Sequence, residues 1–307
     1  MKSAVTSQAE AVPSQDKSDL ATRPRIGIIA GWGRYPIVIV DALKRQGYDV
    51  YGLGVSGHAD PALAEHCVDF DWTGFGRFGS MVRYFRRRGV HDIMMAGKIH
   101  KRQIFQPGFI WRTIPGPTTI RLFAPHFLTR RKDNKDDSLL LTIINFFASR
   151  GIRFAPPTDY LPELLVKSEN LTKRTPSAAQ WKDIRFGWEI AREMGRLDIG
   201  QSVAVKNQAV LAVEAIEGTD ENISRAGSLC TSGGFSVVKV GKPNQDMRFD
   251  VPTVGLGTIE TLSESGGKVL AVEAEKTVFV DREATIAYAN KKGLVLVAIQ
   301  EDELAEK

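Results

Sequence analysis

The sequence predicts an α/β protein with two domains, an N-terminal Rossmann-like parallel sheet and a C-terminal mixed α/β domain. Short apolar runs alternate with helical patterns through the first half, which is typical of parallel strands covered by helices. Pro156 and Pro157 then interrupt the chain where a helix cannot continue. A chain of 307 residues is long enough for two cores. We expect a disordered tail over 1–24, the first domain over 25–152 and the second over 153–307.

The elements of the first half follow from apolar runs bounded by turn residues. Gly47 and Gly89 stand where helices would end, because glycine readily adopts the left-handed conformation past a helix C-terminus. The expected strands are Arg25–Gly31, Asp49–Val55, Cys67–Trp72 and His91–Gly97. The expected helices are Tyr35–Gln46, Asp60–His66, Phe78–Arg88, Pro117–Leu128 and Asp136–Ser149.

The second half has a longer opening helix and then mixes strands with helices. Ser177 is a suitable N-cap for a helix over Ser177–Met194, with Gly195 as its end. Residues Gln201–Ile216 indicate two strands around a short Lys-Asn-Gln turn, and hence some antiparallel pairing. The other expected strands are Ser236–Val240, Lys268–Ala274, Thr277–Val280 and Leu294–Ile299. The other expected helices are Asp220–Leu229, Thr258–Ser265 and Asp281–Lys291.

Composition and charge limit the possible partners. The longest apolar stretch, 139–148, is too short to span a bilayer and indicates a buried or membrane-contacting helix. Two distant cysteines, Cys67 and Cys230, indicate a reducing compartment. Residues 1–150 hold 22 Lys and Arg against 13 Asp and Glu, a net charge of +9, and the remainder holds 19 against 23, a net charge of −4. The basic half suits a phosphate-bearing ligand or an anionic membrane surface. No nucleic-acid motif accompanies this charge, so nucleic acid is not expected as a partner.

Two glycine-containing turns lie at the expected carboxyl edge of the first sheet. The sequence GWGRYP begins at Gly31, and its glycines, Gly31 and Gly33, permit close backbone approach to a phosphate at a helix N-terminus. A purely structural turn explains them as well, and the match to a dinucleotide-binding motif is poor because Pro36 occupies the third glycine position. Lys98 follows the fourth strand in AGK and is a candidate phosphate contact, whereas Lys101 and Arg102 are better explained as solvated.

The stretch from Val213 to Gly255 interleaves acids with lysines in glycine- and proline-rich turns. A few carboxylates beside cations suit Mg²⁺ together with a phosphate, because Mg²⁺ prefers one or two carboxylates plus substrate oxygens. A solvated charged surface is the alternative. Asp250 precedes Val251-Pro252, where proline favours extended backbone and would hold the carboxylate in one direction. Asp220 stands at an expected helix start, where such a residue is more often an N-cap than a ligand. Gln201 is a neutral phosphate or sugar partner, or part of a capping turn.

Several catalytic classes are disfavoured. No HExxH, Walker A or GxSxG motif occurs, and every histidine lies in the first half. Any hydrolysis in the second half would therefore use carboxylates, lysines and a hard metal ion. The basic run RYFRRR (Arg83–Arg88) is most simply the exposed face of a helix, with a membrane-contact patch as the alternative.

Taken together, these segments resemble the metal-dependent UDP-2,3-diacylglucosamine pyrophosphatases of some Gram-negative bacteria. The resemblance covers about residues 25–299, and Asn244 departs from it where the family usually has glycine. The segments that carry it are IGIIAGWGRYP, AGK, DDSLL, TPSAAQWKDIRFG, LDIGQS, AVEAIEGTD, VVKVGKPNQD and RFDVPTVG.

The resemblance implies Mg²⁺-dependent hydrolysis in lipid A biosynthesis, giving UMP and 2,3-diacylglucosamine 1-phosphate (lipid X). It also implies a homodimer with the lipid held between the domains, in the cytoplasm and in peripheral contact with the inner membrane. The residues it suggests as catalytic are Asp250 and Asp220. The metal ligands expected are Glu214, Glu217, Asp220 and Asp250. The substrate-binding residues expected are Gly31, Gly33, Lys98, Gln201, Thr219, Lys239, Lys242 and Gln245.

Two other functions remain open from the sequence. One is an oxidoreductase that binds a nicotinamide nucleotide at GWGRYP, which micromolar retention of NAD(H) would favour. The other is a non-catalytic module that binds a lipid or nucleotide, in which the carboxylates are only surface groups.

Overall fold

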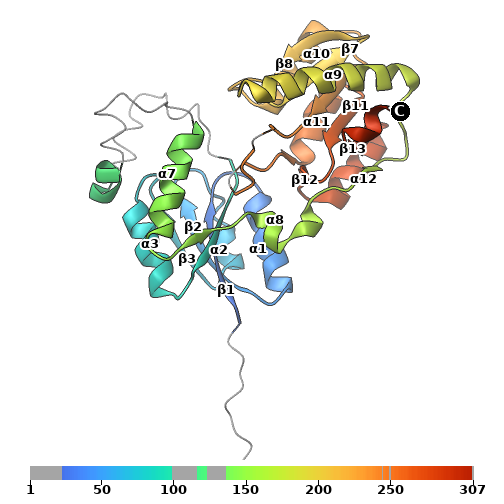
Figure 1. Ribbon diagram of the computed structural model, residues 1–307. Helices are drawn as coiled ribbons and strands as arrows, with labels where there is room; N and C mark the ends of the chain where they lie inside the picture. Colours follow the sequence, from blue (N-terminus) through green and yellow to red (C-terminus); the bar gives the residue numbers. More distant parts are fainter. Residues whose placement is uncertain (1–22, 99–115, 123–135, 244, 249, 306–307) are drawn as a thin grey trace, which may run out of the picture.

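The structure is a computed structural model (Figure 1), and it describes residues 23–98, 116–122, 136–243, 245–248 and 250–305, with the backbone alone for 136–139. Nearly all of the expected tail over 1–24 lies outside these ranges. So do Lys101, Arg102 and Asn244.

The N-terminal domain is built on a five-stranded parallel sheet, as predicted. The strand order is β3-β2-β1-β4-β5, and every neighbouring pair is parallel. The central strand is apolar and buried from its second residue onward, as expected of a strand covered on both faces. The strands are β1 (Arg25–Ala30), β2 (Asp49–Val55), β3 (Asp69–Thr73), β4 (Asp92–Ala96) and β5 (Arg153–Phe154).

Helices cover both faces of this sheet, and each face has its own core. One core joins α1 (Tyr35–Arg45) and α2 (Leu63–His66) to the sheet. The other joins α3 (Phe78–Arg87) and α7 (Asp136–Ala148) to the opposite face, and Figure 1 shows these two groups on either side of the strands. Of the helix expected over 117–128, residues 117–122 are helical and the rest lie outside the described residues.

The N-terminal sheet extends beyond the boundary expected after residue 152. β5 pairs with β4. Tyr160, at the end of the following α8 (Pro157–Tyr160), donates to Asp92 of β4, and η1 (Pro162–Leu164) comes next. Leu161 is fully buried in the same core as α1. The proline pair ends one segment but does not end the domain, because the apolar residues after it complete the N-terminal core.

The C-terminal domain has a six-stranded mixed sheet, as predicted, in the order β6-β13-β11-β9-β7-β8. β9, β11 and β13 are parallel, whereas β6, β7 and β8 join them in antiparallel pairs. The strands are β6 (Glu169–Asn170), β7 (Ser202–Lys206), β8 (Ala209–Val213), β9 (Ser236–Lys239), β11 (Val269–Glu273) and β13 (Val295–Ile299). A separate parallel pair consists of β10 (Thr253–Val254) and β12 (Val278–Phe279). The two-residue strands β6 and β10 were not predicted, because they are too short to show periodicity.

The predicted hairpin between β7 and β8 is confirmed. Asn207 and Gln208 both have positive φ, 51° and 58°, which is the backbone that a tight two-residue turn requires.

One long helix covers one face of the C-terminal sheet and three shorter helices cover the other. Ser177 and Gln180 form a capping box at the start of α9 (Ala178–Arg196), which confirms the predicted N-cap. This helix continues past Gly195, so the predicted end was wrong by two residues. The opposite face carries α10 (Thr219–Leu229), α11 (Leu256–Glu264) and α12 (Arg282–Lys292), and η2 (Asp302–Ala305) ends the described chain.

The two domains contact each other along β12. Val278 and Val280 are buried in the core that contains α1. Arg34, at the start of α1, donates to Asp281 at the start of α12 over 2.7 Å. The contact brings the carboxyl edge of the N-terminal sheet toward the loops of the C-terminal domain.

Within the described residues, no helix has both the length and the apolar composition needed to cross a bilayer. The apolar stretch around 139–148 forms α7, and Ile144 and Phe147 of that helix are buried against the sheet.

Candidate functional site

Lys239 is the centre of a buried polar cluster in the C-terminal domain. It is the last residue of β9, and its side chain is only 3% exposed. The Nζ atom donates to the hydroxyl of Thr219 over 3.1 Å and to the carbonyl of Thr253 over 2.9 Å. A buried ammonium is unfavourable unless such partners compensate for lost water.

The charges around Lys239 come from both domains. Burial lowers the pKa of Lys239, and Glu214, Asp220 and Asp250 oppose that shift because their negative charges favour the ammonium. The positive charge of Lys98 acts in the other direction. Lys98 follows β4 of the N-terminal domain, so the predicted phosphate contact lies within electrostatic reach of Lys239 in the C-terminal domain.

Glu214 and Thr219 connect the end of β8 to the start of α10. The Thr219 hydroxyl donates to the Glu214 carboxylate over 3.2 Å, and both side chains are buried. Gly218 precedes the helix with a φ of 91°, a conformation that favours glycine. The turn between β8 and α10 therefore brings Thr219 and Glu214 close to Lys239.

Asp220 is not the N-cap of its helix. It is the second residue of α10. The N-cap is Gly218, which has no side chain that could form a capping hydrogen bond. Its carboxylate accepts a hydrogen bond from Thr258 of α11 over 2.8 Å. The partner fixes the direction of the carboxylate, and a position in the first turn suits a negative charge. Sequence reasoning missed Thr258, since nothing in the sequence relates it to a residue 38 positions away.

Asp250 lies in the loop before β10 and is half-buried. Its backbone N–H donates to the carbonyl of Asp246 over 3.1 Å. The next residue, Val251, packs against the N-terminal core. Because that core anchors the backbone beside it, the Asp250 carboxylate is placed near Lys239 at the contact between the domains.

Two glutamines and Lys242 surround the same end of β9. Lys242 pairs with Asp198 over 2.5 Å, and its backbone N–H donates to Gln245 over 2.8 Å. Buried Glu273 accepts from the backbone N–H of Gly241 over 2.7 Å. Within the part of the chain that is described, Gln245 Nε2 and Gln201 Oε1 are buried without hydrogen-bond partners.

Glu217, a predicted metal ligand, faces another partner. Its carboxylate is 2.9 Å from the guanidinium of Arg225. The carboxylates that oppose the lowered pKa of Lys239 are those of Glu214, Asp220 and Asp250. Of the four predicted ligands, Glu217 is the one whose carboxylate is paired with an arginine.

The glycines of GWGRYP support a backbone contact within the chain. Trp32 and Lys98 exchange two backbone hydrogen bonds, of 2.8 and 2.9 Å. A Cβ on Gly31 would lie 2.7 Å from the Lys98 carbonyl oxygen, so only glycine allows these loops to meet. Gly33 has a φ of 102° with open space around it. The sequence predicted that Gly31 lets a phosphate come close to the backbone. In the structure, the backbone of Lys98 makes this close approach.

The donor set suits a cation that takes few protein ligands. Among the described residues, no group of three or more His, Cys, Asp or Glu side chains lies close enough to hold a metal by itself. Mg²⁺ commonly binds through one or two carboxylates and completes its shell with water and substrate oxygens. Asp220 and Asp250, which act on the same lysine, fit that pattern.

Sequence comparisons identify relatives of both domains. The family model described as the LpxI N-terminal domain matches residues 25–164, and the model described as the LpxI C-terminal domain matches residues 167–297. A protein named UDP-2,3-diacylglucosamine pyrophosphatase LpxI, from Caulobacter vibrioides, is 30% identical over 286 residues. That alignment covers 91% of this chain and 99% of the relative.

A comparison with solved structures gives only a weak likeness. The biotin carboxylase domain of Hydrogenobacter thermophilus 2-oxoglutarate carboxylase aligns with a TM-score of 0.25 and 10% identity, over 69% of this chain and 42% of that one. A likeness of this size carries no argument about fold or function.

Proposed function

The chain belongs to the LpxI family, and on this premise we propose that it hydrolyses the pyrophosphate bond of UDP-2,3-diacylglucosamine. The products are UMP and 2,3-diacylglucosamine 1-phosphate, which places the reaction in lipid A biosynthesis. The relative from Caulobacter carries this activity in its name and aligns over nearly its whole length.

The observation that carries the proposal is the mixed charge around Lys239. One buried ammonium lies within electrostatic reach of three carboxylates and of Lys98 from the other domain. A diphosphate needs cations for its oxygens, and a divalent cation needs carboxylates. Both are present at one place, at the contact between the domains.

Asp220 and Asp250 are the proposed Mg²⁺ ligands, and Glu214 supports them from its buried position beside Thr219. Bound Mg²⁺ would neutralise phosphate charge and activate the attacking water. Asp220 is the better fixed of the two, because Thr258 holds its carboxylate. Asp250 is the proposed catalytic carboxylate, which orients the water against one phosphorus atom. Glu217 is the weakest candidate, because Arg225 already holds its carboxylate.

Lys239 is the proposed source of charge stabilisation as the leaving phosphate gains negative charge. An ammonium has three N–H donors, and among the described residues Thr219 and Thr253 accept two of them. The third is left for a phosphate oxygen, in surroundings where a charge acts strongly because water is excluded. The amide nitrogen of Gln245, which has no hydrogen-bond partner among the described residues, is a second buried donor. Lys98 and Lys242 would bind outer oxygens of the substrate.

The test measures UMP release from UDP-2,3-diacylglucosamine by the purified full-length chain, with MgCl₂ or with EDTA. We expect UMP only when the metal is present. No UMP under either condition contradicts the proposed hydrolysis. Equal release with and without EDTA leaves the hydrolysis but contradicts the role of Mg²⁺.

We also propose a cytoplasmic homodimer that touches the inner membrane peripherally. The family resemblance implies the dimer and the cytoplasm, and the two acyl chains of the substrate are the reason to expect a membrane contact. Light scattering of the purified chain tests the dimer, and cell fractionation tests the location; a monomer, or recovery only from the periplasm, would contradict these two points.

A further inference from the structure

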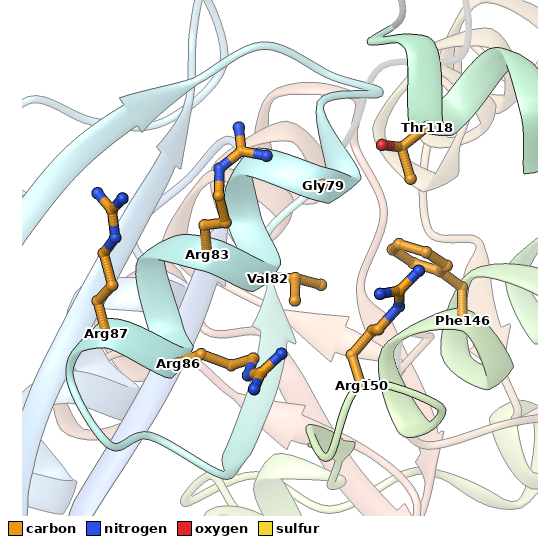
Figure 2. Close-up of a pocket in the computed structure, with 8 residues that line it drawn as sticks. All are labelled: Gly79, Val82, Arg83, Arg86, Arg87, Thr118, Phe146 and Arg150. Atoms are coloured by element: carbon orange, nitrogen blue, oxygen red, sulfur yellow. The ribbon is translucent and has the colours of Figure 1, made fainter.

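Four arginines gather around a cavity on the N-terminal domain, on the face of the sheet opposite α1. The cavity has a volume of about 430 Å³. Arg83, Arg86 and Arg87 come from α3, and Arg150 follows α7. Figure 2 shows the guanidinium of Arg150 beside the Phe146 ring, and Arg86 extending from α3 on the other side of the cavity. We call this the arginine pocket.

The charges of the arginine pocket are not neutralised by neighbouring acids in the described part of the chain. No carboxylate there lies within 4.0 Å of any of its four guanidinium groups, whereas the next arginine along, Arg88, pairs with Asp69 over 2.5 Å. Arg83 donates to the Ser80 hydroxyl over 3.0 Å, and Arg150 lies 5.5 Å from the centre of the Phe146 ring. Concentrated positive charge of this kind attracts anions.

The walls of the arginine pocket are fixed by close packing. A Cβ at Gly79 would lie 2.8 Å from the Thr118 hydroxyl, so glycine at this position lets the helical residues 117–122 close against α3. Thr119 is buried, and its hydroxyl donates to the carbonyl of Gly76. The cavity therefore lies between packed elements and is not a gap between loose side chains.

Apolar side chains accompany the arginines. Val82 and Phe146 line the cavity. Ile120 is 58% exposed on the helical residues 117–122, and Leu141 is 43% exposed on α7, so both elements beside α3 present a large apolar residue to solvent. A basic site with apolar neighbours suits a lipid surface, where phosphate groups lie directly above acyl chains. A nucleic-acid site would instead need stacking platforms along a basic groove.

We propose that the arginine pocket binds the phosphate of an anionic phospholipid headgroup and so holds the N-terminal domain against a bilayer. Guanidinium groups match phosphate oxygens with paired hydrogen bonds, which ammonium groups cannot do. The inference deepens the peripheral membrane contact proposed above. Its test requires no catalysis, so a failure here leaves the proposed hydrolysis unaffected.

The test measures how the full-length chain partitions onto phosphatidylcholine vesicles with and without phosphatidylglycerol. We expect binding to the anionic vesicles that weakens as salt rises, because exposed charges are screened. The double variant Arg86→Gln/Arg150→Gln should lower the partition coefficient about tenfold or more, since each basic residue near a lipid surface contributes several-fold. Unchanged thermal melting shows that the variant is folded.

The matched control is Lys44→Gln/Arg45→Gln. These residues are also basic and exposed, and they lie in the last turn of α1, on the other face of the N-terminal sheet. The control loses the same net charge, and its partition should change less than about threefold. An equal loss in both double variants contradicts the proposal, because it shows a response to net charge alone.

A second pair of substitutions tests the guanidinium geometry. Arg86→Lys/Arg150→Lys keeps the charge and removes the paired hydrogen bonds, so we expect vesicle binding to fall below that of the unaltered chain. Full retention of binding in this variant contradicts a phosphate-specific pocket. Binding of inorganic phosphate or an RNA oligonucleotide that needs Arg86 and Arg150, without any vesicle binding, also overturns the proposal.

Discussion

The two domains use the carboxyl ends of their parallel strands in different ways. In the N-terminal domain, the loops after β1 and β4 meet backbone to backbone at Trp32 and Lys98. In the C-terminal domain, β9 ends in a buried ammonium that is surrounded by hydroxyls and carboxylates. At the first edge, two loops are joined by backbone hydrogen bonds and present one lysine. At the second edge, several polar and charged side chains lie together around Lys239.

We therefore expect the two edges to play different roles at one site. The junction of Gly31 with Lys98 fixes where the N-terminal domain presents its positive charge. The polar cluster around Lys239 would act on the substrate. Changes in the cluster should therefore impair turnover most, whereas changes in the junction should act first on stability and binding.

The largest effect is expected from Asp250→Asn, which keeps the shape of the side chain and removes its charge. If the carboxylate orients the attacking water, kcat for UMP release should fall about a hundredfold or more. Binding of the product and the far-UV circular dichroism should be retained. Near-normal turnover would remove Asp250 from the mechanism.

Asp246→Asn is the matched control, in the same loop and with the same chemistry. Its carboxylate is held by Arg248, which lowers the pKa of Asp246. We expect kcat to change by less than about fivefold, because this acid is a structural partner. Equal losses in both variants would assign the effect to the loop and not to the carboxylate.

A loss of about a hundredfold in kcat/KM is expected for Lys239→Met, because a buried charge that faces the reacting phosphate is removed. Lys242→Met should cost less, since Lys242 is more exposed and already pairs with Asp198. Steady-state kinetics of the two variants make the comparison. A larger loss for Lys242→Met would indicate that the loop after β9, and not Lys239, is the centre of the site.

The burial of Lys239 also leads us to expect that the stability of the fold depends on pH. Burial lowers its pKa below the ordinary 10.5, so the unfolded chain binds this proton more tightly than the folded one. Stability attributable to Lys239 should therefore rise as pH increases toward 10.5. Denaturant unfolding from pH 8 to 10 should show the free energy of the unaltered chain rising relative to that of Lys239→Met. A constant or falling difference would contradict the direction of the shift.

The junction in the N-terminal domain is tested by Gly31→Ala. The added Cβ would lie 2.7 Å from the Lys98 carbonyl, so the loops must separate, at a cost of about 1–3 kcal/mol in unfolding free energy. KM for the substrate should rise as Lys98 shifts. Gly257→Ala is the control, because a Cβ there meets nothing within 4 Å, and stability should stay the same or rise slightly. Unchanged stability in Gly31→Ala would contradict the tight contact.

The smallest effect is expected at the edge of the N-terminal sheet. Arg153 and Tyr160 both donate to Asp92, and they lower its pKa below the ordinary 3.8. The stabilisation is present above that value and is lost as pH falls through the lower pKa of the folded chain. Asp92→Asn should cost about 0.5–1 kcal/mol at pH 7, because the pair is partly exposed. The difference from the unaltered chain should shrink below pH ~4, and urea unfolding at both pH values tests this.

Local sequence patterns were sufficient to predict most of the fold. The apolar run at β1 and the capping box at Ser177 are properties of neighbouring residues, so the strand and the helix start were predicted directly. The parallel N-terminal sheet and the mixed C-terminal sheet followed from the order of such elements. The domain boundary did not, because β5 and Leu161 belong to the first domain only through packing with distant residues.

The candidate site likewise combines features that could be predicted from the sequence with features that could not. Lys239, Asp220 and Asp250 stand out in the sequence because acids and lysines are unusual beside buried strands and proline turns. That Lys239 is buried, that Thr258 holds Asp220, and that Glu217 pairs with Arg225 could not be predicted. Each depends on the distance between side chains from different elements, which is set when the sheet and its helices pack together. Residue types and their spacing thus specify which chemistry the chain carries, whereas three-dimensional packing specifies which of these groups meet and which are held apart.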